Sequence, residues 1–158
     1  MLPFGMYPKG LQSIIDLFEK LSDEEKRETL ISYADQASKW GPRVGENFDL
    51  EDVRKDEECT DTVGVFLRVL PDDQAVFRIT LGPQVQTLTR AMASILCRGF
   101  QGAPITQILD VPADFVPRIV GSDLIRVRSQ TVYYVLTRMK SISKVFSDRR
   151  RAVMARAE

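Results

Sequence analysis

The sequence predicts an α+β fold, in which helices flank a small antiparallel β-sheet. Two observations lead to this class. Apolar residues recur every three or four positions near both ends of the chain, and they alternate with other residues between positions 63 and 81. The first spacing is typical of helices with one buried face, and the second is typical of strands. Because the strands and helices fall in separate parts of the chain, the order is that of an α+β domain rather than of repeated βαβ units.

Two helices are predicted before the sheet. The first has an apolar stripe made of Leu11, Ile14, Ile15, Leu17, Phe18 and Leu21. The second begins after Ser22, because Ser22-Asp23-Glu24-Glu25 forms a capping box: the serine hydroxyl accepts from the backbone N–H of Glu25, whose carboxylate reaches back to the backbone N–H of Ser22. The apolar positions of this second helix keep its period up to Trp40, where Gly41-Pro42 ends it; they are Leu30, Ile31, Ala34 and Ala37.

A hairpin is predicted in the middle of the chain. Residues 43–61 have no helical period, so we expect a long acidic connection there, with one edge strand around Phe48 to Val53. The segments 63–70 and 75–81 are dense in β-branched and aromatic residues, and the four residues 71–74 between them are typical of a turn. We therefore expect an antiparallel sheet of at least two strands, and of three with the edge strand.

Helices make up the rest of the chain. One begins after Gly82-Pro83, short ones follow after Pro104 and around residues 114–119, and a last long helix runs from about Arg128 to Phe146. We expect the helix after Gly82 and the helix after Arg128 to cover one face of the sheet. A chain of 158 residues has the length of one domain. We assign residues 1–146 to that domain and 147–158 to a basic C-terminal tail.

The composition excludes several kinds of site. The chain has no histidine and two cysteines, which rules out a Ser-His-Asp triad, a Cys-His pair, histidine-ligated metals and a four-thiolate metal cage. We therefore expect no metal and no cofactor. The sequence also has no apolar run of about 20 residues and no secretory signal. We expect a cytoplasmic protein with reduced thiols and no membrane partner.

Charge is distributed unevenly although the chain is neutral overall. Residues 46–61 contain eight acidic and two basic residues, a net charge of −6, whereas residues 138–158 contain seven basic and two acidic residues, a net charge of +5. The basic end is compatible with an acidic protein, or with a solvated helix end. No aromatic residue follows Phe146 and no nucleic-acid motif accompanies the basic end, so we do not expect a nucleic-acid partner.

The two cysteines are the candidates for chemistry. Cys59 comes at the end of the acidic connection, immediately before the first hairpin strand, where a thiol can meet a partner or can be an inert surface group. Cys97 is expected on the flank of the helix after Gly82, in a packing role. No Cys-x-x-Cys pair is present, which excludes a thioredoxin-type couple.

The chain resembles the SufE family of sulfur acceptors, from about Leu11 to Val145. The resemblance rests on the order of the elements and on local segments, namely Leu30-Ile31-Ser32-Tyr33-Ala34, the cysteine before the hairpin, Gly82 opening a helix that contains Arg90, residues 102–109, and Arg128-Ser129-Gln130. It implies an antiparallel sheet flanked by helices, similar to the IscU-type scaffold fold. It also implies Cys59 as the sulfur acceptor and Arg128 as a second site residue.

The chain departs from the family pattern around the cysteine. The family motif Gly-Cys-Gln-Ser-Gln-Val-Trp is replaced here by Glu58-Cys59-Thr60-Asp61-Thr62-Val63-Gly64, and the usual Asp-Ser-Asp after the glycine is replaced by Pro83-Gln84-Val85. The carboxylates around Cys59 disfavour a thiolate, so we expect its pKa at or above the reference value of about 8.5. Arg128, if it approaches the thiol, offsets part of this.

The resemblance implies a function in iron-sulfur cluster assembly. Cys59 would receive persulfide sulfur from a cysteine desulfurase, a pyridoxal phosphate enzyme, and would pass it to a scaffold protein. The protein would then be a carrier and activator rather than a stand-alone enzyme. Two alternatives stay open: a SufE-like interaction module or adaptor without sulfur transfer, and an adaptor whose acidic loop binds a basic protein unrelated to sulfur.

Overall fold

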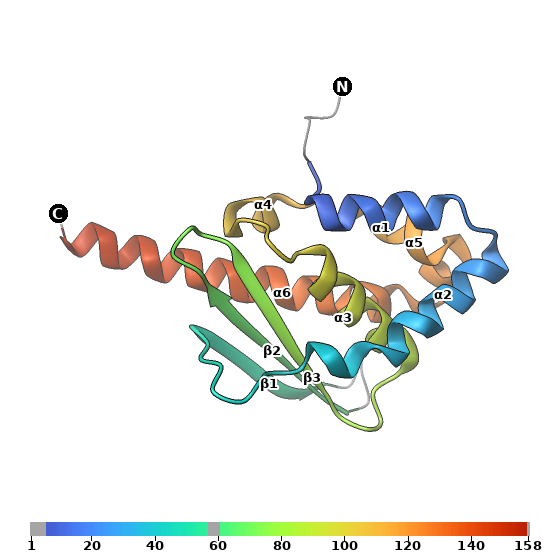
Figure 1. Cartoon of the computed structure of the whole chain (residues 1–158), viewed down its shortest axis with the longest axis horizontal. Helices are drawn as coiled ribbons and strands as arrows, with labels where there is room; N and C mark the ends of the chain where they lie inside the picture. The colour runs from blue at the N-terminus through green and yellow to red at the C-terminus, as the bar shows by residue number, and fades with distance from the viewer. Residues whose placement is uncertain (1–5, 57–60, 158) are drawn as a thin grey trace.

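The computed structural model describes residues 6–56 and 61–157 and has the α+β fold that the sequence predicts (Figure 1). Three strands form one antiparallel sheet, and helices gather on one of its faces. The elements, in chain order, are α1 (Lys9–Glu19), α2 (Asp23–Asp35), η1 (Ala37–Trp40), β1 (Leu50–Asp56), β2 (Asp61–Val69), β3 (Ala75–Leu81), α3 (Thr87–Gly99), α4 (Ile105–Asp110), η3 (Ala113–Phe115), α5 (Val116–Val120) and α6 (Ser122–Ala157).

The sheet has the strand order β1-β2-β3, and both pairs are antiparallel. Alternate residues of β2 and β3 are buried toward α3 and α6, which confirms the predicted hairpin and the helices that cover it. The edge strand begins two residues later and ends three residues later than predicted. Charged residues fill most of β1, as is common on exposed edges, so apolar alternation does not reveal its extent.

Helix α3 lies at the centre of the helical layer rather than on its surface. It packs against α1, α2, α6 and β3, and side chains on all its sides are buried, including Ser94 and Cys97. The flanking position expected for Cys97 is therefore wrong. Small residues allow this close packing: a Cβ on Gly99 would lie 3.1 Å from the Cβ of Leu11.

The boundaries of two predicted helices also differ. The capping box at Ser22 forms as predicted, with both of its hydrogen bonds, but α2 ends at Asp35 and a 3₁₀ turn continues to Trp40. Helix α6 begins before Arg128 and extends beyond Phe146 to Ala157. The backbone of Arg128 is non-helical (φ −129°, ψ 32°), so a kink there separates a short helical segment from the long helix, which starts where the sequence predicts. No helix among the described residues has both the length and the apolar character needed to cross a membrane.

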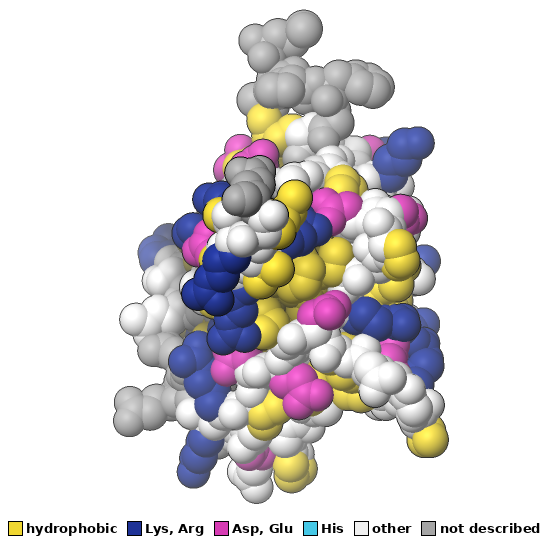
Figure 2. All heavy atoms as spheres, turned by 90° about the vertical axis from the view of Figure 1, so that its left-hand side faces the viewer, with side chains coloured by type: hydrophobic (Ala, Val, Ile, Leu, Met, Phe, Trp, Pro, Cys, Tyr) yellow, Lys and Arg dark blue, Asp and Glu magenta, His cyan; other side chains and the backbone are white. Residues whose placement is uncertain are grey.

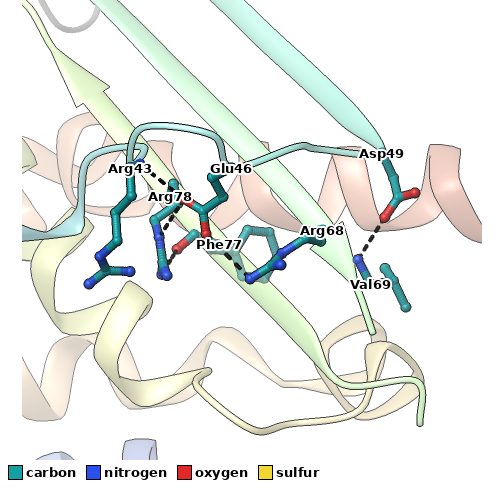
Figure 3. A network of polar contacts seen from close by, with 7 residues as sticks. All are labelled: Arg43, Glu46, Asp49, Arg68, Val69, Phe77 and Arg78. Carbon is teal, nitrogen blue, oxygen red and sulfur yellow. Dashed lines mark hydrogen bonds and ion pairs between the residues drawn. The ribbon is translucent and has the colours of Figure 1, made fainter. Parts of the chain in front are cut away.

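The face of the sheet opposite the helices carries a polar network from the loop before β1 (Figure 3). The buried carboxylate of Glu46 accepts from Arg78 at 3.1 Å and from Arg68 at 3.4 Å, and it also accepts the backbone N–H of Arg43. Burial opposes ionisation of this carboxyl, but these donors outweigh it and lower the pKa of Glu46. The carboxylate of Asp49 accepts the backbone N–H of Val69. These contacts fix the loop across the sheet.

Candidate functional site

The candidate sulfur acceptor follows the end of β1. Strands β1 and β2 stay in register up to the pair Asp56 and Asp61, and residues 57–60 connect them. Cys59 is one of these four residues and lies outside the described part of the chain. Within the acidic connection expected over residues 43–61, the predicted edge strand is present as β1, and four residues lie between β1 and β2.

Asp61 joins the end of β2 to the segment before α3. Its carboxylate accepts the backbone N–H of Gln84 at 2.8 Å and that of Thr62 at 2.7 Å, and these hydrogen bonds lower the pKa of Asp61. The carboxylate lies directly over Gly82, where an added Cβ would be 2.3 Å from the carboxyl carbon. Gly82 therefore provides the space that lets an acidic side chain from β2 bind this turn.

Two arginines donate hydrogen bonds to backbone carbonyls near the candidate site. Arg90 on α3 donates to the carbonyls of Gly82 and Val85, which fixes the turn that Asp61 binds. Arg138 on α6 is 2% exposed and donates to the carbonyls of Val63 on β2 and Asp52 on β1, as well as to the Tyr134 hydroxyl. It therefore ties β1 and β2 to the helical layer.

Arg128 lies at the kink of α6, exposed to solvent. It borders a groove of about 550 Å³ between α2, α3 and α6, together with Arg27, Leu30, Ile31, Gln86, Thr87, Leu88, Ala91 and Leu124. Gln86 and Thr87 directly follow the turn bound by Asp61, so Arg128 and the end of β2 both lie near the segment 82–87. Whether Arg128 approaches Cys59 lies outside the described residues.

Cys97 is enclosed in the core. It is 3% exposed, and burial raises the pKa of its thiol to about 12, an effect only partly offset by Arg78. This agrees with the packing role expected from the sequence, although the position on the helix differs. A thiol in this state is neither ionised at neutral pH nor accessible to a partner.

Sequence reasoning missed several residues of this region. The roles of Arg90, Arg138 and Asp61 were not predicted, because hydrogen bonds from side chains to backbone groups leave no pattern in the sequence; those of Arg138 also join segments 75 and 86 residues apart. Ile31 was placed with the buried positions of its helix, but it is 53% exposed and borders the groove beside Arg128. A signal was available in Arg27 and Ile31, which are one helical turn apart and so share a face.

No group of three or more Cys, Asp or Glu side chains in residues 6–56 and 61–157 is arranged to hold a metal ion. The fold is that of a small α+β protein, with one three-stranded antiparallel sheet and a helical layer on one of its faces. Residues 12–143 match the family model of SufE, described as an Fe-S metabolism associated domain. The match spans most of the chain, and the protein belongs to the SufE family.

A solved structure supports the fold. A solution structure described as that of a hypothetical protein from Thermus thermophilus superposes with a TM-score of 0.64 at 20% sequence identity, over 87% of this chain and 96% of that chain. At this identity the likeness concerns the fold alone. No curated protein matches the sequence.

Proposed function

We propose that this protein accepts sulfur on Cys59 from a cysteine desulfurase, a pyridoxal phosphate enzyme, and passes it to an iron-sulfur scaffold protein. Membership of a family associated with iron-sulfur metabolism supports the general role. The observation that carries the specific assignment is the burial of Cys97. With two cysteines in the sequence, it leaves Cys59 as the thiol available to a partner.

The chemistry needs a thiolate and a persulfide, but neither histidine nor a metal. The Cys59 thiolate attacks the outer sulfur of the donor's persulfide, so that a new S–S bond forms on Cys59 and the S–S bond of the donor breaks. The donor cysteine leaves as a thiolate, and the transferred sulfur keeps its proton. The second transfer repeats this exchange, with Cys59 as the leaving thiolate.

The charges near the hairpin tune this reaction. The lowered pKa of Asp61 keeps its carboxylate ionised, two residues after Cys59, although two backbone N–H groups share its charge. Arg128 is the residue we assign to thiolate stabilisation, since its guanidinium has no ion-pair partner among the described residues. A desulfurase with a basic docking surface would add further positive charge, so we expect the thiol to react mainly in the complex.

The adaptor without sulfur transfer is the alternative, favoured by the altered residues on both sides of Cys59. In that role the hairpin and the groove beside Arg128 would bind a partner, and the thiol would be idle.

Persulfide labelling separates the two functions. The protein is incubated with a cysteine desulfurase, L-cysteine and pyridoxal phosphate, and persulfides are then detected by alkylation and mass spectrometry. We expect label on Cys59 in the wild type and none in Cys59→Ser, with unchanged folding by circular dichroism. Cys97→Ser is the matched control and should keep the label. Equal labelling of wild type and Cys59→Ser would exclude the carrier function.

A further inference from the structure

The C-terminal end of α6 forms a groove with the start of β1, far from the hairpin end that carries Cys59. The groove has a volume of about 330 Å³ and is lined by Asp49 and Leu50 from β1 and the loop before it, and by Phe146, Arg149, Arg150, Val153 and Met154 from α6. Figure 2 looks at this end of the molecule and shows hydrophobic side chains gathered in a hollow beside a column of Lys and Arg side chains.

The C-terminal part of α6 has apolar side chains that are exposed to solvent. Residues 151–157 are all exposed, and they include the apolar side chains of Val153 and Met154, which are 65% and 63% exposed. At 100° per residue, Phe146, Arg149, Arg150 and Val153 fall on one side of the helix, whereas Arg151 and Ala155 fall on the other. The match to the family model ends at residue 143, so this amphipathic segment lies beyond the matched residues.

Contacts with the sheet hold the groove open. Arg150 pairs with Asp73 in the turn between β2 and β3 and stacks over the Phe146 ring at 5.1 Å. Within the described chain, Arg149, Arg151 and Arg156 make no ion pair. The groove thus combines an apolar floor with one lining arginine, Arg149, that makes no ion pair among the described residues.

Its position separates it from the candidate sulfur site. Asp61 is at one end of β2, and the turn that contains Asp73 follows the other end. Nine residues at a rise of about 3.3 Å place the two ends of β2 roughly 26 Å apart. A partner in the groove therefore leaves the hairpin end free.

The shape and the charge of the groove argue against several kinds of binding partner. A lipid surface is flat and does not fill a concave site between a helix and a strand. A second copy placed symmetrically would bring Arg149 and Arg150 against the same arginines, which is repulsive. For a nucleic acid, the apolar floor offers no aromatic surface to the bases beyond half-buried Phe146.

We propose that this groove is a docking site for an acidic protein segment that inserts apolar side chains between carboxylates. The apolar side chain fills the space between Leu50, Phe146 and Val153, and a carboxylate beside it pairs with Arg149 on the rim. The site is independent of sulfur transfer and is occupied while the hairpin end meets another protein.

The test measures the binding of a fluorescent synthetic peptide to the full chain by fluorescence anisotropy. The peptide is helical and has Leu at positions i and i+4, flanked by Glu. The matched variants are Arg149→Glu on the groove side and Arg151→Glu on the opposite side, which change the charge equally. We expect Arg149→Glu to weaken binding by about tenfold or more and Arg151→Glu by about threefold or less. In a second pair of variants, Val153→Asp on the groove side should weaken peptide binding strongly, whereas Ala155→Asp on the opposite side should have little effect. Circular dichroism verifies that both variants fold.

The other outcomes overturn the proposal. Equal weakening by Arg149→Glu and Arg151→Glu means nonspecific attraction, and no binding of the peptide at low salt means no site. Tighter binding to phosphatidylglycerol vesicles or to a DNA oligonucleotide assigns the surface to those ligands. Self-association in sedimentation that is abolished by Val153→Asp assigns it to a second copy. None of these readouts involves Cys59, so the result does not depend on the proposed function.

Discussion

Removing the guanidinium of Arg138 should destabilise β1 and β2, the strands that precede and follow the candidate thiol. Arg138→Met keeps most of the volume of this side chain, which is 2% exposed, but it removes the donors to the carbonyls of Val63 and Asp52 and to the Tyr134 hydroxyl. Hydrogen bonds from a charged donor contribute about 1.5–3 kcal/mol each. The Asp52 carboxylate is 36% exposed, so its ion pair with Arg138 adds little.

We expect Arg138→Met to lower the free energy of unfolding by about 3 kcal/mol, less than the sum over the individual bonds because water replaces part of them. Urea unfolding followed by circular dichroism measures this change. Arg54→Met is the matched control: Arg54 lies 3.7 Å from the same Asp52 carboxylate but is 56% exposed, so its loss should cost about 0.5 kcal/mol or less. A cost below about 1 kcal/mol for Arg138→Met would refute the idea that this arginine anchors the hairpin.

Three further predictions concern the thiols and the turn beside them. Changing Glu57 and Glu58 to Gln should speed iodoacetamide alkylation of Cys59 at neutral pH, most strongly at low salt, because exposed charges are screened over about 10 Å at 0.1 M salt; an indifferent rate would contradict the acidic-loop argument. Cys97, with a pKa of about 12, should react with Ellman's reagent only after unfolding, and fast reaction in the native protein would show that its burial is incomplete. Gly82→Ala should destabilise the protein by about 1 kcal/mol in thermal melts, because its Cβ displaces the Asp61 carboxylate, and the cost should shrink in an Asp61→Ala background.

The sequence predicts the elements whose signals are local. The capping box at Ser22 and the alternation in β2 and β3 are properties of short segments, and both form as predicted. Likewise, the fold class follows from the order of these elements. The extent of β1 was not predictable, because an exposed edge strand gains its order from hydrogen bonds to β2 rather than from its own apolar pattern.

Features that depend on packing between distant segments were missed. The burial of α3 on all sides follows from the close approach of α1 at Gly99 and from contacts with α2 and α6, which one helix's periodicity does not reveal. The residues of the candidate site likewise include some that the sequence suggests and others that only the structure reveals. Cys59 and Arg128 remain predictions based on family resemblance, whereas Arg90, Arg138 and Asp61 emerge only when the tertiary hydrogen bonds are known.

The departures from the family motif have different physical meanings along the hairpin. Asp61 forms the last pair of the β1–β2 ladder, where its carboxylate adds negative charge two residues from the thiol and also binds the turn before α3. This change alters the electrostatics without opposing the fold. Gly64, which replaces the tryptophan of the motif, is a structural change. A Cβ at this position would lie 2.3 Å from Oγ1 of Thr80 and 3.0 Å from side-chain atoms of Phe66 and Val53.

The face of the sheet that a tryptophan would cover is therefore already filled by neighbours of Gly64. Phe66 packs against Phe48, with ring centroids 5.2 Å apart, and so continues this cover from the adjacent position on the same face. The surroundings of Gly64 are thus occupied by side chains of the sheet itself. The departure that bears on the thiol is the added negative charge around it, so we expect salt and the charge of a bound partner to govern the reactivity of Cys59.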